Sequence, residues 1–179
     1  MAFHHVAFAS RDLESTHRFY TEAMGFSLVK LVAGPTPEGG WAKHAFYATD
    51  DDGGESGMIA FWDLHVESLR DFPTDHNESI GLPGWVNHVA FDAPSLEVLE
   101  AHRRRWQEQG MTVVEVNHGF CTSIYTSDPN GITVEFCCTT RAFTDEEWQW
   151  AATNLLESDV ELEPMPDAVF HEPLAAAPA

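Results

Sequence analysis

The four residues His-Val-Ala-Phe stand at positions 5–8 and stand again, in the same order, at positions 88–91. Each copy is followed by a short polar stretch, then by a segment whose apolar residues have helical spacing, and then by a glycine, Gly25 or Gly110. A serine or aspartate precedes each helical segment as an N-cap would, and glycine is the usual residue just after a helix. This repetition of residues and of order predicts two copies of one structural module.

Runs rich in β-branched and aromatic residues follow each helical segment and predict three further strands per module. The expected strands are 27–32, 42–48 and 58–64 in the first module and 112–116, 122–126 and 132–138 in the second. Residues 128–131, Asp-Pro-Asn-Gly, have the composition of a tight turn before the last strand. The order βαβββ, found twice, predicts an α+β protein in which two tandem modules form one cupped mixed sheet.

The composition divides the chain into four regions. We expect a first module at residues 1–65, a connecting arm rich in Pro and Gly at 66–84, and a second module at 85–141. Residues 142–179 are predicted to form a C-terminal helix and an acidic tail rich in Pro and Ala. Thr144 and Glu147 have the spacing of a capping box that begins this helix, and beyond Ser158 we expect an extended or disordered chain.

The charge balance excludes several classes of partner. The chain has 29 acidic and 9 basic side chains and a formal net charge of −20, which repels nucleic acid and anionic membrane surfaces. No apolar run reaches the ~18 residues that a membrane span needs, and the first residues do not resemble a signal peptide. The three cysteines form no Cys-x-x-Cys motif. We therefore expect a cytoplasmic protein without nucleic-acid or membrane partners.

Strand alternation indicates which side chains share a face. It places His5 and His88 at equivalent positions of the two repeated strands, and it places His4 on the face opposite His5. In the last strand, Phe136 belongs to an apolar face and leaves Glu135 on the other. A carboxylate in such apolar surroundings is costly to bury alone, and one divalent cation is a partner that two imidazoles and a carboxylate can share. The pattern predicts a metal site formed by these two histidines and this glutamate.

Two stretches of the chain resemble the vicinal oxygen chelate superfamily, namely HHVAFASRDLESTHRFYTEAMGF near the start and NHVAF with YTSDPNGITVEF later on. This superfamily includes glyoxalase I, extradiol catechol dioxygenases, fosfomycin-resistance thiol transferases and bleomycin-binding proteins. The resemblance covers about Phe3 to Cys138. It implies paired βαβββ modules around one metal ion, with ligands on the first and last strands of the modules, where His5, His88 and Glu135 lie.

The resemblance also implies a fourth ligand position on the last strand of the first module. Aligning residues 57–58 with residues 131–132 places Phe61 opposite Glu135, and phenylalanine cannot bind a metal. Glyoxalase I usually has a protein ligand there, so its chemistry is disfavoured. Two histidines and one carboxylate leave coordination positions open, as in the non-haem Fe(II) oxygenases.

Tyr125 lies ten residues before Glu135 and resembles the active-site tyrosine of extradiol dioxygenases. His118 is a candidate acid or base close to the same strand, and His44 is another candidate. The resemblance thus implies a dioxygenase that uses one divalent metal, with Fe(II) favoured over Mn, Zn or Ni. Its substrates would be an aromatic catechol and dioxygen, in a cavity whose expected apolar lining is Trp41, Phe46 and Phe61.

Two other functions are compatible with the same residues. One is a glyoxalase-like lyase or isomerase, or a thiol transferase, that uses another divalent metal. The other is a metal-free protein that sequesters an aromatic drug, although such proteins typically lack the three ligands. In each case the expected partner is a small molecule, and a homodimer is compatible with the resemblance.

Overall fold

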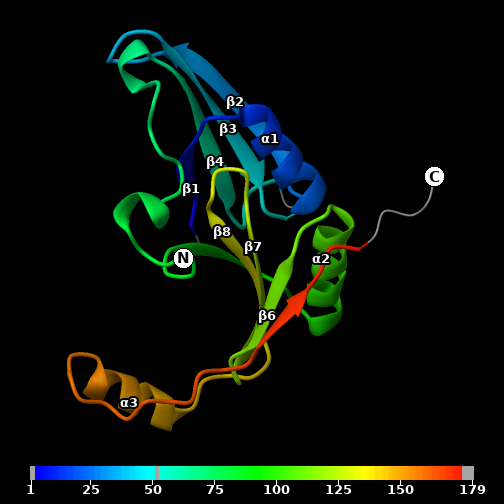
Figure 1. Ribbon diagram of the computed structural model, residues 1–179, viewed down its shortest axis with the longest axis vertical. Coiled ribbons are helices and arrows are strands. Elements are labelled where there is room, and N and C mark those ends of the chain that lie inside the picture. The colour runs from blue at the N-terminus through cyan, green and yellow to red at the C-terminus, as the bar shows by residue number, and fades with distance from the viewer. Residues whose placement is uncertain (1–2, 51–52, 175–179) are drawn as a thin grey trace. The chain divides into compact units, whose positions relative to one another are not determined.

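The computed structural model describes residues 3–50 and 53–174 (Figure 1). The first module contains β1 (His5–Ser10), α1 (Leu13–Arg18) with a π-helix (Phe19–Ala23), β2 (Ser27–Pro35), β3 (Trp41–Ala48) and β4 (Met58–His65). The second contains β5 (His88–Asp92), α2 (Leu96–Glu108), β6 (Val113–Asn117), β7 (Cys121–Ser127) and β8 (Thr133–Thr139), and α3 (Asp145–Asn154) and β9 (Ala168–His171) follow it. The predicted α+β class and the repeated βαβββ order are confirmed.

The strands are arranged in two sheets. The first sheet has the order β1-β4-β3-β2, in which β1 is parallel to β4 and the other neighbours are antiparallel. The second has the order β5-β8-β7-β6-β9, and β6 is antiparallel to both β7 and β9. By packing, the chain divides into unit 1 (Met1–Phe91 with Thr126–Val134) and unit 2 (Asp92–Tyr125 with Glu135–Ala179). No helix among the described residues is long and apolar enough to cross a bilayer.

The predicted helix caps are present. The side chain of Asp12 accepts a hydrogen bond from the Ser15 backbone at the start of α1 (2.9 Å), and Ser95 caps α2 in the same way. Thr144 begins α3 with a complete capping box. Gly110 follows α2 with a φ of +82°, a left-handed conformation that glycine adopts without steric cost.

The core of unit 1 lies between the first sheet and the helical segment. Tyr20 of the π-helix is fully buried against Phe61 of β4, with ring centroids 4.6 Å apart, and Tyr47 of β3 packs beside them. Because side chains alternate along a strand, the neighbours of Tyr47 and Phe61 point to the other side of this sheet. That side, here called the His5 face, carries His5 together with His44, Phe46 and Trp62.

The turn before β8 is held by a buried carboxylate, Asp128, which is 5% exposed. Its Oδ1 accepts hydrogen bonds from the backbone nitrogens of Asn130 and Ile132, each at 2.8 Å. Its Oδ2 accepts from the Tyr20 hydroxyl at 3.1 Å and from the Asn130 side chain at 3.0 Å. Burial raises the pKa of Asp128, and its effect exceeds that of these hydrogen bonds, which act to lower the pKa. The Asp-Pro-Asn-Gly turn is thereby tied to the helical segment of the first module.

In unit 2, α2 packs on the second sheet through Trp106, which is fully buried. The ring centroids of Trp106 and of Phe136 on β8 are 5.4 Å apart. The ring of His102 also stacks on Phe136, with centroids 3.7 Å apart and an interplanar angle of 10°. The helix therefore covers the apolar face that the last strand was predicted to have. Glu135 belongs to the opposite face of β8.

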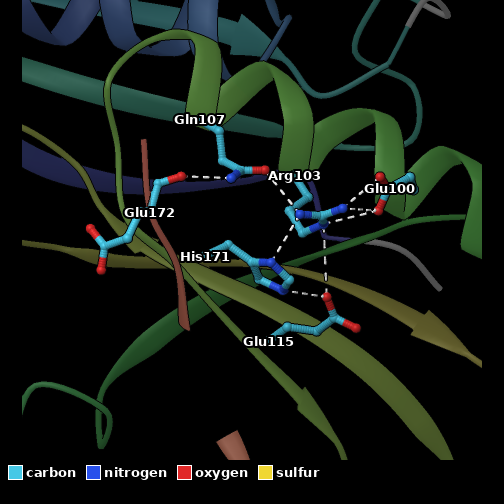
Figure 2. Close-up of polar contacts among 6 residues, drawn as sticks. All are labelled: Glu100, Arg103, Gln107, Glu115, His171 and Glu172. Atoms are coloured by element: carbon cyan, nitrogen blue, oxygen red, sulfur yellow. Dashed lines mark hydrogen bonds and ion pairs between the residues drawn. The ribbon is translucent and has the colours of Figure 1, made fainter. Parts of the chain in front are cut away.

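The chain returns to unit 2 after α3 as strand β9, in a stretch that the sequence predicted to be extended or disordered. β9 pairs with β6, and its last residue, His171, accepts a hydrogen bond from Arg103 of α2 (3.0 Å) and donates one to Glu115 (2.8 Å; Figure 2). Arg103 also contacts Glu100 and Gln107 of its own helix. The polar cluster in Figure 2 therefore joins α2, β6 and β9; residues 175–179 of the predicted tail lie outside the described residues.

Candidate metal ligands and their surroundings

His5 begins β1 in unit 1 and is exposed to solvent. Its ring lies 6.1 Å from that of His44 and 5.3 Å from that of Phe46, measured between centroids. Its Nδ1 is 2.8 Å from Nδ1 of His4, so the prediction that His4 faces away from His5 is wrong. His4 precedes the first residue of β1, and strict strand alternation does not extend to it. Because Nδ1 of His5 is engaged in this way, Nε2 is the nitrogen suited to a metal.

His88 begins β5, also in unit 1, and its ring is oriented by the backbone. Its Nδ1 lies 3.2 Å from the carbonyl oxygen of Trp85. A carbonyl oxygen can only accept, so Nδ1 carries the proton and the lone pair is on Nε2. Metal-binding histidines commonly have this tautomer, in which the second ring nitrogen donates to a backbone carbonyl. The donor chemistry of His88 therefore fits a metal ligand.

Glu135 belongs to a chain of hydrogen bonds in unit 2. The hydroxyl of Tyr125 donates to Oε1 of Glu135 at 3.2 Å, and Nε2 of His118 lies 3.0 Å from that hydroxyl. The tyrosine has a single proton, so when it donates to the carboxylate it must accept from His118. Burial raises the pKa of Tyr125 to about 12, and the hydroxyl stays protonated at neutral pH. The structure thus brings together Glu135 and both residues that the sequence nominated as catalytic.

The structure places His5 and His88 in unit 1 and Glu135 in unit 2. Across residues 3–50 and 53–174, it gathers no three His, Cys, Asp or Glu side chains into a group that could hold a metal ion. The predicted three-residue site therefore stays a prediction. The chemistry of the three side chains supports it. The Nδ1 atoms of His5 and His88 are held by hydrogen bonds, which leaves Nε2 for a metal, and the Glu135 carboxylate is 5% exposed.

The predicted position of Phe61 is wrong by one residue. Phe61 is fully buried against Tyr20 of unit 1, just as Phe136 of unit 2 packs on Trp106. Phe61 therefore corresponds to Phe136, and the residue that corresponds to Glu135 is Ala60. Alanine has no ligand atom either, so the conclusion that this position lacks a protein ligand is unchanged.

The predicted cavity lining is only partly correct. Phe46 lies on the His5 face, but Phe61 is in the core, and Trp41 stacks on His65 with ring centroids 3.7 Å apart. Trp62 was not among the predicted lining residues, although it belongs to the His5 face. Only the strand register, which pairs Trp62 with His44, would have placed it there. On the His5 face, the rings of His44 and Phe46 therefore lie next to His5, and Trp62 joins this group by stacking on His44.

His44 is the buried polar residue of this group, at 8% exposure. Its ring stacks on Trp62 at 3.8 Å, and its Nε2 has no hydrogen-bond partner within the described part of the chain. Burial, with a smaller effect of nearby His5, lowers the pKa of His44, so the imidazole is neutral at pH 7. A buried nitrogen of this kind can serve a bound ligand, because an unmet hydrogen bond is costly.

Comparison with known proteins defines the family. The family model of the Glyoxalase/Bleomycin resistance protein/Dioxygenase superfamily matches residues 2–136, and the chain belongs to this superfamily. This confirms the resemblance that the sequence motifs indicated. No curated protein matches the chain.

Several solved structures share the fold at low sequence identity. A glyoxylase/bleomycin resistance protein/dioxygenase domain from Frankia sp. EAN1pec has a TM-score of 0.55 and 19% identity, over 75% of this chain and 94% of that one. A putative dioxygenase from Bacillus subtilis subsp. subtilis str. 168 has a TM-score of 0.58 and 16% identity, over 81% and 44%. The antibiotic-binding protein TnmS3 from Streptomyces sp. CB03234 has a TM-score of 0.52 and 20% identity, over 78% and 97%. At these identities the likeness shows the fold.

Proposed function

We propose that this chain is a metal-dependent enzyme, an extradiol-type dioxygenase that opens a catechol-like ring with Fe(II) held by His5, His88 and Glu135. The observation that carries the proposal is the hydrogen-bonded chain from Glu135 through Tyr125 to His118. When bound, Fe(II) supplies Lewis acidity and a common binding place for two substrate oxygens and dioxygen.

Tyr125 and His118 have the properties of a substrate-orienting pair. With a pKa raised to about 12, the Tyr125 hydroxyl is a hydrogen-bond donor at neutral pH, and its position is fixed by the Glu135 carboxylate. His118 is exposed, so its imidazole can exchange a proton with solvent while Nε2 holds the tyrosine oxygen. We assign to Tyr125 the orientation of a substrate oxygen, to which its single proton would turn from Glu135 once substrate is bound, and to His118 the transfer of a proton at Nε2.

The His5 face supports an aromatic substrate. Phe46 and Trp62 offer flat apolar surfaces near His5, and aromatic rings pack well on such surfaces. The neutral His44 ring between them provides a nitrogen for a substrate hydroxyl. A ring that carries two adjacent oxygens has both the apolar and the polar character that this group of side chains would bind.

The experiment combines metal analysis with an oxygen assay. Protein purified without air should contain close to one iron per chain, and it should consume oxygen when it is given a matching member of a catechol panel. Glu135→Gln keeps the size of the side chain and removes its charge, so we expect metal affinity to fall at least about tenfold while the circular dichroism spectrum is unchanged. Glu38→Gln, on an exposed residue, is the matched control and should leave metal content unchanged.

Two outcomes would assign the chain to another function. Zn, Ni or Mn in an enzyme that is indifferent to air would indicate a lyase, an isomerase or a thiol transferase. Tight binding of an aromatic compound by metal-free protein would indicate a drug-binding protein. Full metal occupancy in Glu135→Gln would show that Glu135 is not a ligand.

A further inference from the structure

The segment of unit 1 that runs from β4 to β5, drawn in green in Figure 1, is tied together by one buried side chain, Asn77. Asn77 is 2% exposed, and its amide group donates hydrogen bonds to the carbonyl oxygens of Gly84 and Asn87, each at 2.8 Å. It also accepts a hydrogen bond from the backbone nitrogen of Asn87 at 2.9 Å. The side chain of Asn77 therefore holds both ends of the stretch 84–87, which leads directly into His88 and β5.

The contact between Asn77 and Asn87 has the form of a pairing between two strands. The backbone of Asn87 both donates to and accepts from a single amide, and it obtains from one side chain the two hydrogen bonds that a neighbouring strand would supply. A backbone nitrogen can only donate and a carbonyl oxygen can only accept, so these partners also fix which atom of the Asn77 amide is the oxygen. The orientation of the Asn77 side chain is therefore determined.

The stretch that Asn77 holds carries the carbonyl group that orients His88. Trp85 lies between Gly84 and Asn87, and its carbonyl oxygen is 3.2 Å from Nδ1 of His88. The Trp85 side chain is 74% exposed, so packing of its indole contributes little to the position of that carbonyl. The position depends instead on the anchored residues on either side, Gly84 and Asn87, and both are anchored by Asn77.

We propose that Asn77 is a positioning residue, which acts through the Trp85 carbonyl to hold the His88 ring in the tautomer with the proton on Nδ1. In this tautomer the lone pair lies on Nε2, the nitrogen that is left for a metal. The role rests on the proposed function, in which His88 is a metal ligand. Loss of a group that orients a ligand histidine typically lowers metal affinity about 10- to 100-fold.

A purely structural role for Asn77 predicts a different result. A buried amide that only joins two parts of the chain lowers the stability when it is lost, but it leaves the His88 ring as it was. Gln107 of unit 2 is a buried amide of this kind, because it is 6% exposed and its side chain donates to the carbonyl oxygen of Glu172 at 2.6 Å (Figure 2). Gln107→Met is therefore the matched control for the loss of a buried amide.

The first measurement uses the full chain without metal and does not depend on activity. Long-range ¹H–¹⁵N NMR of the imidazole rings at about pH 8.5, where an ordinary histidine is neutral, shows which ring nitrogen carries the proton. His88→Gln identifies the His88 signals by their loss. We expect the Nδ1–H tautomer alone in the native chain and a mixture of both tautomers in Asn77→Leu, which keeps roughly the size of the side chain without its hydrogen bonds. Gln107→Met should keep the native His88 signals.

The second measurement is the binding of Co(II) to the same metal-free proteins, followed by visible absorption without substrate. Asn77→Leu should raise the dissociation constant about tenfold or more, whereas Gln107→Met should leave it within about twofold. Circular dichroism checks that the variants are folded. If Asn77→Leu does not fold, Asn77→Ser tests the same point, because the smaller side chain leaves room for water beside the backbone groups of Gly84 and Asn87.

Two results would overturn the proposal. One is a native chain in which His88 already has mixed tautomers or the Nε2–H form, since the Trp85 carbonyl would then not fix the ring. The other is a folded variant at Asn77 whose His88 tautomer is unchanged, which would make the role of Asn77 purely structural. A native chain that binds no Co(II), or an altered tautomer with unchanged Co(II) affinity, would count against His88 as a ligand and so against the proposed function. In both of those cases the tautomer in metal-free protein still decides the role of Asn77.

Discussion

Replacing Asp128 by alanine should destabilise the protein strongly, because several buried groups depend on this one carboxylate. It accepts hydrogen bonds from the backbone nitrogens of Asn130 and Ile132 and from the hydroxyl of Tyr20, which is fully buried. Each buried polar group left without a partner costs about 1–3 kcal/mol. Relief from burying a charged side chain offsets part of the loss, since burial raises the pKa of Asp128. We therefore expect the free energy of unfolding to fall by about 3–5 kcal/mol, out of the ~5–15 kcal/mol typical of a folded domain.

Asp128→Asn is the control for the carboxylate charge. The asparagine oxygen can replace Oδ1 and still accept from the two backbone nitrogens, whereas its amide group meets the Tyr20 hydroxyl and the Asn130 side chain in place of Oδ2. We expect a loss of about 1–2 kcal/mol, clearly smaller than that of alanine. Urea unfolding followed by far-ultraviolet circular dichroism measures both values. A loss below about 1 kcal/mol for Asp128→Ala, or an equal loss for both variants, would refute the reasoning.

Two further predictions concern the site and the core of unit 2. Tyr125→Phe removes one hydrogen bond that involves a charged group, which is worth about 1.5–3 kcal/mol. We therefore expect kcat to fall about ten- to a hundredfold, while the metal content measured in the same sample stays the same. Unchanged turnover would show that Tyr125 has no part in the mechanism. Burial, with a smaller effect of Arg105, lowers the pKa of His102 to about 4 in the folded protein, against 6.5 in the unfolded chain. As the pH falls, the unfolded chain therefore binds a proton at His102 before the folded protein does. The free energy of unfolding decreases over the range from pH 6.5 to about 4. His102→Phe keeps the stacking on Phe136 and should remove on the order of 2 kcal/mol of that loss, measured by urea unfolding at pH 7 and pH 4.5.

The elements of the fold were predictable because their signals are local. The repeated His-Val-Ala-Phe fixed two equivalent strands, and Ser95 and Thr144 cap α2 and α3 where the sequence placed caps. The resemblance to extradiol dioxygenases, rather than strand spacing, indicated Tyr125 and His118 as neighbours of Glu135, and the structure joins the three by hydrogen bonds.

The errors arose where the answer depends on register or on distant parts of the chain. Gly57 is three residues from Ala60, whereas Gly131 is four residues from Glu135, and an offset of one residue moves a side chain to the other face of a strand. Phe61 was misplaced for this reason. Strand β9 was missed because its four residues become a strand only by pairing with β6, about fifty residues earlier in the chain.

Strand β9 also has a consequence for the behaviour of the protein in concentrated solution. Without it, β6 would be the edge of the second sheet, and its unpaired backbone, with Val113, Val114 and Val116 alongside, would be a template for aggregation. The strand that takes over the edge is four residues long and lies between Asp167 and Pro173, which are features that discourage further strand addition. The superfamily core is thus shielded by residues that do not belong to it. A chain shortened to the end of β8 would lose solubility even if every residue of the candidate site were retained.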